Sequence, residues 1–148
     1  MSTSQGGAVV RALDRQEIED LLSEFSARVD EGRGATVHEL FVESGRIETP
    51  QFVLASRDEI RERFTARAKD TARKSRHYWS NARFTGSESE VTVVTNVMTV
   101  VTVTDKPAMF MSGSSIDVFV RENSRWAFKS RRLEVVFEGS LAPKEPGR

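Results

Sequence analysis

Apolar residues recur at helical spacing near the start of the chain. Five of them fall on one face of a helix drawn through this segment: Ile18, Leu21, Leu22, Phe25 and Val29. This spacing predicts an amphipathic helix over residues 14–30. Asp14 is the expected N-cap, because Glu17 three residues later would complete a capping box. Gly32 and Gly34 are expected to end the helix.

The pattern then breaks into shorter pieces. A second, short helix is predicted over residues 35–41, in which Phe41 would be buried. A first strand is expected over residues 45–50, because it ends at a proline, and its hairpin partner over residues 51–55.

A third helix is predicted to begin after Ser56. Ser56 can cap it, and Glu59 completes a capping box. Ile60 and Phe64 form its apolar stripe. The remaining positions are mostly charged and are expected to form a solvated outer face: Arg57, Asp58, Arg61, Glu62, Arg63, Arg67 and Lys69.

From about residue 73 the apolar period changes from helical to alternating. Four strands are predicted, separated by short turns: 75–85, 91–104, 109–121 and 126–138. The second of them is rich in Val and Thr. Sequential strands with short turns form an antiparallel meander. Helices followed by long strands indicate an α+β fold, in which the concave face of a curved sheet leaves room for a pocket.

The length of 148 residues fits one domain, predicted over residues 13–140 between a flexible leader, 1–12, and a flexible tail, 141–148. The 22 basic and 22 acidic side chains balance, so nucleic acid is not an expected partner. No apolar run approaches the ~18 residues of a membrane span, and the first residues lack a signal-peptide pattern. We therefore expect a cytoplasmic protein without membrane contact.

Composition also limits the chemistry. There is no cysteine, which excludes disulfides and thiolate metal sites, and the two histidines, His38 and His77, lie far apart in sequence. We expect no metal. No phosphate loop or dinucleotide fingerprint is present, so no cofactor is expected and acid–base chemistry is the class that remains.

Several short motifs, in order, resemble one known group of proteins. They are Ala27–Gly32, Leu40–Phe41, Arg57–Ile60, Arg76–His77 with Asn81, Gly113 with Asp117, and Trp126–Arg131. Over residues 14–138 this order resembles the nuclear transport factor 2-like superfamily, in its SnoaL-like, scytalone dehydratase-like branch. The resemblance implies a cone-shaped (cystatin-like) α+β barrel, usually a dimer that packs sheet against sheet.

The dehydratase-like members of that branch use a histidine on the third strand and an aspartate near the end of the first helix. His77 and Asp30 stand at the matching positions. The sequence departs from the pattern at Phe25, which replaces a tyrosine and cannot donate a hydrogen bond. A second histidine, expected within residues 91–104, is also missing.

If Asp30 and His77 are adjacent, the carboxylate fixes the imidazole tautomer and the free ring nitrogen can act as a general base. That pair suits removal of a proton next to a carbonyl group, and hence loss of water or isomerisation. The alternative is structural: an aspartate that caps a helix end and a half-buried histidine.

Other side chains are candidates for binding a substrate. Four aromatic residues are expected to wall the pocket: Phe25, Phe41, Phe64 and Trp79. Asn81 lies four residues beyond His77, so a regular strand would place both on one face, where Asn81 could hold a substrate oxygen.

Four polar or flexible residues on the later strands complete the candidates. Asn96, Met98 and Asp117 are predicted to line the pocket, with an exposed sheet face or a dimer interface as the alternative. Of the adjacent Arg131 and Arg132 only one can face inward, and the resemblance favours Arg131, which could pair with an anionic substrate or with Asp117.

The sequence therefore predicts a cofactor-independent acid–base enzyme, a dehydratase, isomerase or cyclase, acting on a small hydrophobic ketone-bearing metabolite. A non-catalytic ligand-binding or assembly module of the same fold is the alternative. A subunit like the small subunit of ring-hydroxylating dioxygenases is the third hypothesis. A homodimer through the outer sheet face is expected.

Overall fold

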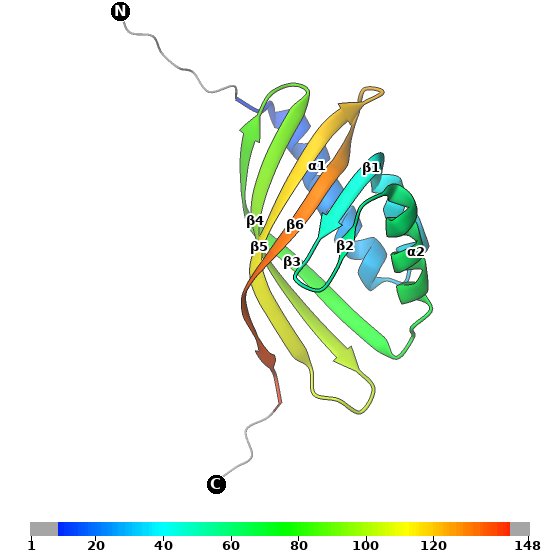
Figure 1. Ribbon diagram of the computed structural model, residues 1–148. Helices are drawn as coiled ribbons and strands as arrows, with labels where there is room; N and C mark the ends of the chain where they lie inside the picture. The colour runs from blue at the N-terminus through cyan, green and yellow to red at the C-terminus, as the bar shows by residue number, and fades with distance from the viewer. Residues whose placement is uncertain (1–8, 143–148) are drawn as a thin grey trace, which may run out of the picture.

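The computed structural model describes residues 9–142 and has helices on the concave side of one curved sheet (Figure 1). The strands are β1 (Phe41–Glu48), β2 (Val53–Leu54), β3 (Arg73–Gly86), β4 (Glu90–Val103), β5 (Met109–Glu122) and β6 (Arg125–Ser140). Their order is β2-β1-β6-β5-β4-β3, and only the β1–β6 pair is parallel. The sheet is not closed, and the α+β prediction is confirmed.

Helix α1 (Ala12–Asp30) supplies one side of the core. Ile18, Leu22, Phe25 and Val29 are buried, as their spacing predicts. The sheet side of the core is aromatic: the ring of Phe128 lies 4.9 Å from that of Phe41 and 4.4 Å from that of Phe119. The ring of Phe25 in α1 lies 6.0 Å from that of Phe128. Burial of a large side chain of this kind contributes about 1.5–3 kcal/mol, so this packing holds α1 against the sheet.

The first turn of α1 differs from the predicted capping box. Arg11 is the N-cap and makes no side-chain cap hydrogen bond. Asp14 lies in the first turn of α1, and its side chain is buried. Its carboxylate accepts hydrogen bonds from Arg11, Arg121 and Trp126. Tertiary partners from the β5–β6 end of the sheet therefore replace the local cap. At the other end, Gly32 has a φ of +77° and ends the helix as predicted.

The middle of the chain contains η1 (Gly34–Leu40), a 3-10 helix, and α2 (Arg57–Ala68). Strand β1 begins at Phe41, earlier than the predicted residue 45, because parallel pairing with β6 already includes Phe41 and Phe128. Ser56 caps α2 by accepting from the Glu59 amide at 3.2 Å. The Glu59 carboxylate accepts a hydrogen bond from the Ala55 amide at 2.6 Å. The predicted capping box therefore forms with the amide of Ala55 in place of the amide of Ser56, the N-cap residue.

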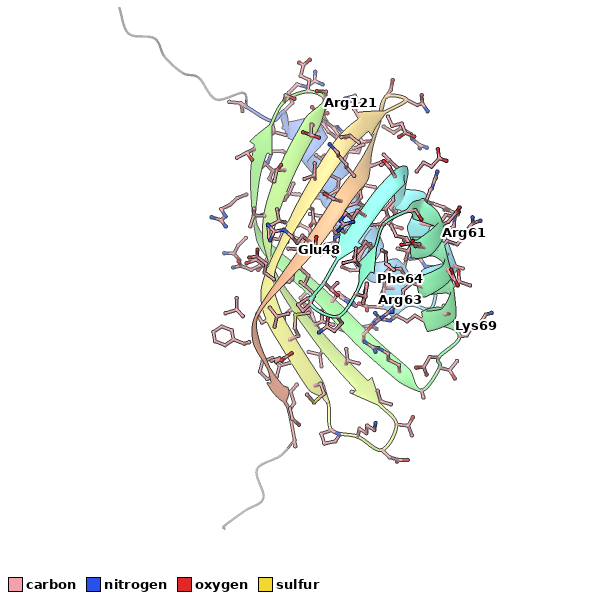
Figure 2. The ribbon with its side chains drawn as sticks, viewed as in Figure 1. Glu48, Arg61, Arg63, Phe64, Lys69 and Arg121 are labelled. Atoms are coloured by element: carbon pink, nitrogen blue, oxygen red, sulfur yellow. The ribbon has the colours of Figure 1, made fainter. Side chains whose placement is uncertain are left out.

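Strands β3 to β6 extend well beyond α1 and α2, and α2 faces their inner side across a gap that side chains line (Figure 2). Among residues 9–142, no helix is long and apolar enough to cross a membrane. Most of the predicted leader and most of the predicted tail lie outside the described residues. Helix α1 already begins at Ala12, the last residue of the predicted leader. The domain boundaries therefore stay a prediction.

Candidate active site

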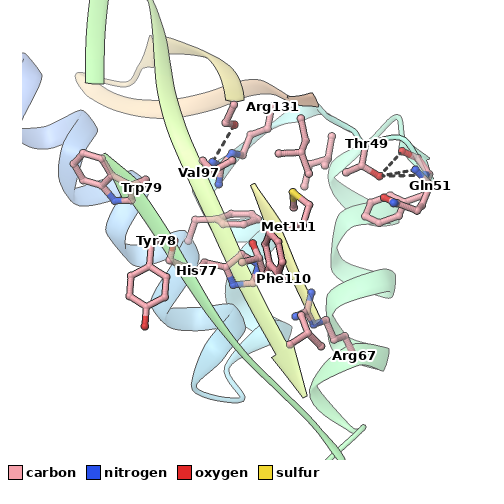
Figure 3. Close-up of a pocket in the computed structure, with 18 of the residues that line it drawn as sticks. Thr49, Gln51, Arg67, His77, Tyr78, Trp79, Val97, Phe110, Met111 and Arg131 are labelled. Carbon is pink, nitrogen blue, oxygen red and sulfur yellow. Dashed lines mark hydrogen bonds between the residues drawn. The ribbon is translucent and has the colours of Figure 1, made fainter. Parts of the chain in front are cut away.

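A cavity of about 440 Å³ lies between the inner face of the sheet, α1 and α2 (Figure 3). Its floor includes one row of directly paired residues, His77, Thr99, Met111 and Glu138, from β3, β4, β5 and β6. Paired residues on neighbouring strands point to the same face, so strand register alone places the imidazole of His77 toward the cavity.

His77 contacts the last residue of α1. Its Nδ1 atom lies 2.6 Å from Oδ1 of Asp30, and its backbone amide donates to Oδ2 of Asp30 at 2.8 Å. The Ser75 hydroxyl donates to Oδ1 of Asp30 at 2.7 Å. One carboxylate therefore holds both the ring and the backbone of His77, and α1 fixes that carboxylate.

The protonation state of Asp30 follows from these contacts. Burial raises the pKa of Asp30, but hydrogen bonds from His77 and Ser75 outweigh that effect and hold the pKa below its ordinary value of 3.8. An ionised carboxylate can only accept hydrogen bonds, so Nδ1 must carry the hydrogen. In neutral His77 the lone pair is then on Nε2, which no described residue binds.

Arg131 faces the cavity and pairs with Asp117. Its Nε donates to Oδ1 of Asp117 at 2.8 Å and its Nη2 to Oδ2 at 3.2 Å. Burial raises the pKa of Asp117, while the charge of Arg131 and hydrogen bonds from Arg131 and Ser115 oppose that rise. Arg132 is exposed on the opposite face. Asp117 does not line the cavity and instead anchors Arg131 beneath it.

Three of the four predicted aromatic walls line the cavity: Phe25, Phe64 and Trp79. The Phe25 ring lies 4.2 Å from the Arg131 guanidinium, so it forms a cation–π contact where the resemblance would place a tyrosine. Phe41 is 2% exposed and does not line the cavity. That assignment is wrong, because Phe41 begins β1 and stacks on Phe128 inside the core.

Three further predicted binding residues point away from the cavity. Asn81 does not share the face of His77, because a β-bulge between Ser80 and Arg83 gives Asn81 a φ of +55° and turns it outward. Asn96 and Met98 lie on the outer face of β4, where Met98 is 41% exposed. The inner face of β4 instead contributes Val97, Thr99 and Val101, which alternate along the strand with the outward-facing Asn96 and Met98.

The sequence patterns do not identify Arg67 and Ser75 as site residues. Arg67 was expected on the solvated face of its helix, yet it lines the cavity and its Nη2 donates to the Ser75 hydroxyl at 3.0 Å. Its position three residues after Phe64 was the available signal, because residues at that spacing share a helix face. In contrast, Arg61 and Lys69 lie on the side of α2 away from the sheet (Figure 2).

The described residues contain no cluster of three His, Asp or Glu side chains that could hold a metal ion. His38 lies in η1, apart from the cavity lining, and its buried Nδ1 atom has no hydrogen-bond partner within the part of the chain that the structure covers. The side chains gathered at the cavity therefore offer acid–base groups, an ion pair and two further cations, Arg67 and Arg73.

The model of the SnoaL-like domain matches residues 10–132. No curated protein matches the chain. Among solved structures, a provisionally assigned scytalone dehydratase from Novosphingobium aromaticivorans aligns with a TM-score of 0.80 and 23% identity, over 89% of this chain and 90% of that chain.

Two further structures share this architecture. A hexachlorocyclohexane dehydrochlorinase, LinA type 2, aligns with a TM-score of 0.79 and 15% identity, over 92% of this chain and 96% of that chain. A provisionally assigned aromatic ring hydroxylase from Novosphingobium aromaticivorans aligns with a TM-score of 0.81 and 19% identity, over 90% of this chain and 96% of that chain. At such identities the likeness establishes the fold alone.

Proposed function

This chain belongs to the SnoaL-like domain family, and from that premise we propose that it is a cofactor-independent acid–base enzyme acting on a small hydrophobic ketone-bearing metabolite. The observation that carries the proposal is the 2.6 Å contact between His77 Nδ1 and Asp30 Oδ1 at the wall of the cavity. A histidine oriented in this way is a general base with its second nitrogen open to a ligand.

The reaction begins with His77. Its Nε2 takes the proton from the carbon next to the ketone, and the electron pair of that C–H bond forms the enolate. Asp30 stabilises the resulting imidazolium through the existing hydrogen bond. In a β-hydroxy ketone the enolate then expels the hydroxyl group, which takes the same proton back from His77 and leaves as water. The net change is loss of one water molecule, with His77 returned to its neutral form.

Arg131 is suited to bind the ketone oxygen. Two of its nitrogens are engaged by Asp117, and the third, Nη1, has no hydrogen-bond partner within residues 9–142. A fixed donor aimed at the oxygen stabilises the charge that develops on the enolate. The ion pair keeps the guanidinium in one orientation, so Asp117 acts through Arg131 without contacting the substrate.

The structural neighbours support elimination as the reaction class. One neighbour is provisionally assigned as a scytalone dehydratase, and another is a hexachlorocyclohexane dehydrochlorinase. Removal of water and removal of HCl share one requirement, a base that takes a proton beside a carbon bearing a leaving group. Isomerisation or cyclisation would use the same first step with a different fate for the enolate.

The alternative is a non-catalytic binding module, and Phe25 at the position of a tyrosine favours it. The short His77–Asp30 contact favours the enzyme, because a module that only binds ligands does not need an oriented base. The third hypothesis, a dioxygenase-type subunit, predicts that the isolated chain requires a partner protein.

The test is turnover of a panel of β-hydroxy ketones with one- and two-ring skeletons, followed by absorbance of the enone product. We expect wild type and His38→Gln to form enone and His77→Gln to lose the activity by about 10²–10⁴-fold. His38→Gln is the matched control, because His38 does not line the cavity. Equal rates for wild type and His77→Gln would refute the proposal.

A further inference from the structure

Arg67 is a cavity-lining cation that forms no ion pair with a carboxylate in the described part of the chain. Arg67 extends from the last turn of α2 into the space that His77 lines (Figure 3). Its one side-chain hydrogen bond within residues 9–142 goes to the Ser75 hydroxyl, which is neutral. A guanidinium has five N–H donors, so most of its hydrogen-bonding capacity is left for something else.

The surroundings of Arg67 make this unpaired charge costly. Burial, helped by the neighbouring cations Arg73 and Arg63 and opposed by Asp30 and Asp70, lowers the pKa of Arg67 to about 10. Removing a charge from water without a partner is unfavourable in general. Arg67 remains charged at neutral pH, so an anion that enters the cavity relieves that cost.

Arg131 does not compete for this role. The fork of Arg131 already holds the carboxylate of Asp117, so that charge is neutralised within the protein. The acidic residues of the cavity lining, Glu48 and Glu138, form no ion pair with Arg67 in the described part of the chain. Arg73 also lines the cavity without an ion pair, but it is exposed, whereas Arg67 combines partial burial with the lack of a carboxylate partner within residues 9–142.

We propose that Arg67 binds a carboxylate of the substrate, which makes the substrate class an apolar keto acid rather than a neutral ketone. A planar guanidinium and a carboxylate form two parallel hydrogen bonds, and the single negative charge of a carboxylate matches the single positive charge of Arg67. Apolar side chains from β4 and β5, among them Val101, Phe110 and Met111, line the cavity that Arg67 and His77 share. This inference rests on the proposed function for the reacting end of the ligand.

The contact with Ser75 gives a second role that must be separated from binding. Arg67, Ser75, Asp30 and His77 form one chain of hydrogen bonds, with steps of 3.0, 2.7 and 2.6 Å. A residue that only positioned Asp30 would affect neutral and anionic ligands alike. A residue that binds a carboxylate discriminates between a ligand and its uncharged isostere.

The experiment uses calorimetric titration at low ionic strength with three matched pairs: benzoate, cinnamate and naphthalene-2-carboxylate, each with its carboxamide. In wild type at least one carboxylate should bind about tenfold more tightly than its amide or better. Arg67→Gln should remove that preference while amide binding stays within about twofold, and Arg67→Lys should retain part of it. Arg61→Gln, an exposed arginine on the same helix, is the control and should behave as wild type.

Three outcomes would overturn the proposal. Wild type could show no preference for any carboxylate, Arg67→Gln could weaken carboxylate and amide equally, or phenyl phosphate could bind more tightly than the carboxylates. The readout is binding and is independent of turnover. If the protein prefers carboxylates but forms no enone, the result supports carboxylate binding by Arg67 and refutes the proposed function.

Discussion

The Nδ1 atom of His77 lies 2.6 Å from Oδ1 of Asp30, although 47 residues separate the two in sequence. The end of α1 supplies the carboxylate and the inner face of β3 supplies the imidazole, so the packing of one helix on one strand creates the pair. Asp30 also binds the backbone amide of His77, which couples the position of the strand to that of the side chain.

Asp30→Asn should reduce turnover of the β-hydroxy ketone panel by about 10²–10⁴-fold, the usual contribution of an oriented general base. An amide oxygen can still accept the His77 amide hydrogen bond, but it cannot stabilise the imidazolium as a charged carboxylate does. The measurement is kcat for the variant against wild type, with circular dichroism to verify the fold. Undiminished kcat in a folded Asp30→Asn protein would show that the carboxylate has no catalytic part.

Asp14 should make stability depend on acid pH. A hydrogen bond from Trp126 lowers the pKa of Asp14 most, and bonds from Arg11 and Arg121 add to it against burial, which brings the pKa to about 2 from an ordinary 3.8. A carboxyl group with a depressed pKa stabilises the folded state fully above its unfolded pKa and loses that contribution as pH falls through its folded pKa.

The midpoint of thermal unfolding for Asp14→Asn should therefore lie below that of wild type at pH 7, and the difference should shrink between about pH 4 and pH 2. Asp20→Asn is the control, because Asp20 is exposed on the same helix. A wild-type advantage that stays constant across this pH range would argue against the stabilising role of ionised Asp14.

The outer sheet face should form a homodimer interface. Tyr78, Met98, Ser112 and Phe137 are directly paired across β3, β4, β5 and β6 and form one row. The exposed fractions are 54% for Tyr78, 41% for Met98 and 65% for Phe137. Exposed apolar side chains grouped on one sheet face are typical of an interaction site.

Analytical ultracentrifugation at micromolar concentration should find a dimer for wild type and a monomer for Met98→Lys. Val53→Lys is the matched control, since Val53 is 48% exposed but lies on β2, away from that row. A monomeric wild type would rule out this interface.

Much of the fold follows from local patterns in the sequence. The helical spacing around Ile18 and Leu22 predicts α1, and alternation in the second half predicts the long strands of the meander. The sequence predictions are wrong where contacts between residues far apart in the chain determine the local structure. Asp14 is no N-cap because Trp126 and Arg121 reach it from the far end of the sheet, and β1 starts early because β6 pairs with it in parallel.

The site was less accessible from sequence. The resemblance pointed to Asp30 and His77, and the structure brings these two side chains together. The prediction that Asn81 shares a strand face with His77 is wrong, because a β-bulge in β3 reverses the faces after Ser80. A bulge leaves no strong local signal in the sequence. Sequence patterns do not reveal Arg67 as a cavity residue, because charged residues on a helix usually face solvent, whereas in this structure Arg67 lines the cavity together with Phe64.

The central claim is that His77, oriented by Asp30, removes a proton from a ketone bound in the cavity. Hydrogen–deuterium exchange at the carbon next to the carbonyl of 1-tetralone in D₂O, followed by mass spectrometry, measures that step without any leaving group. Wild type should accelerate exchange well above the buffer rate, and His77→Gln should return it to that rate. Identical exchange with both proteins, or none above buffer with wild type, would contradict the account.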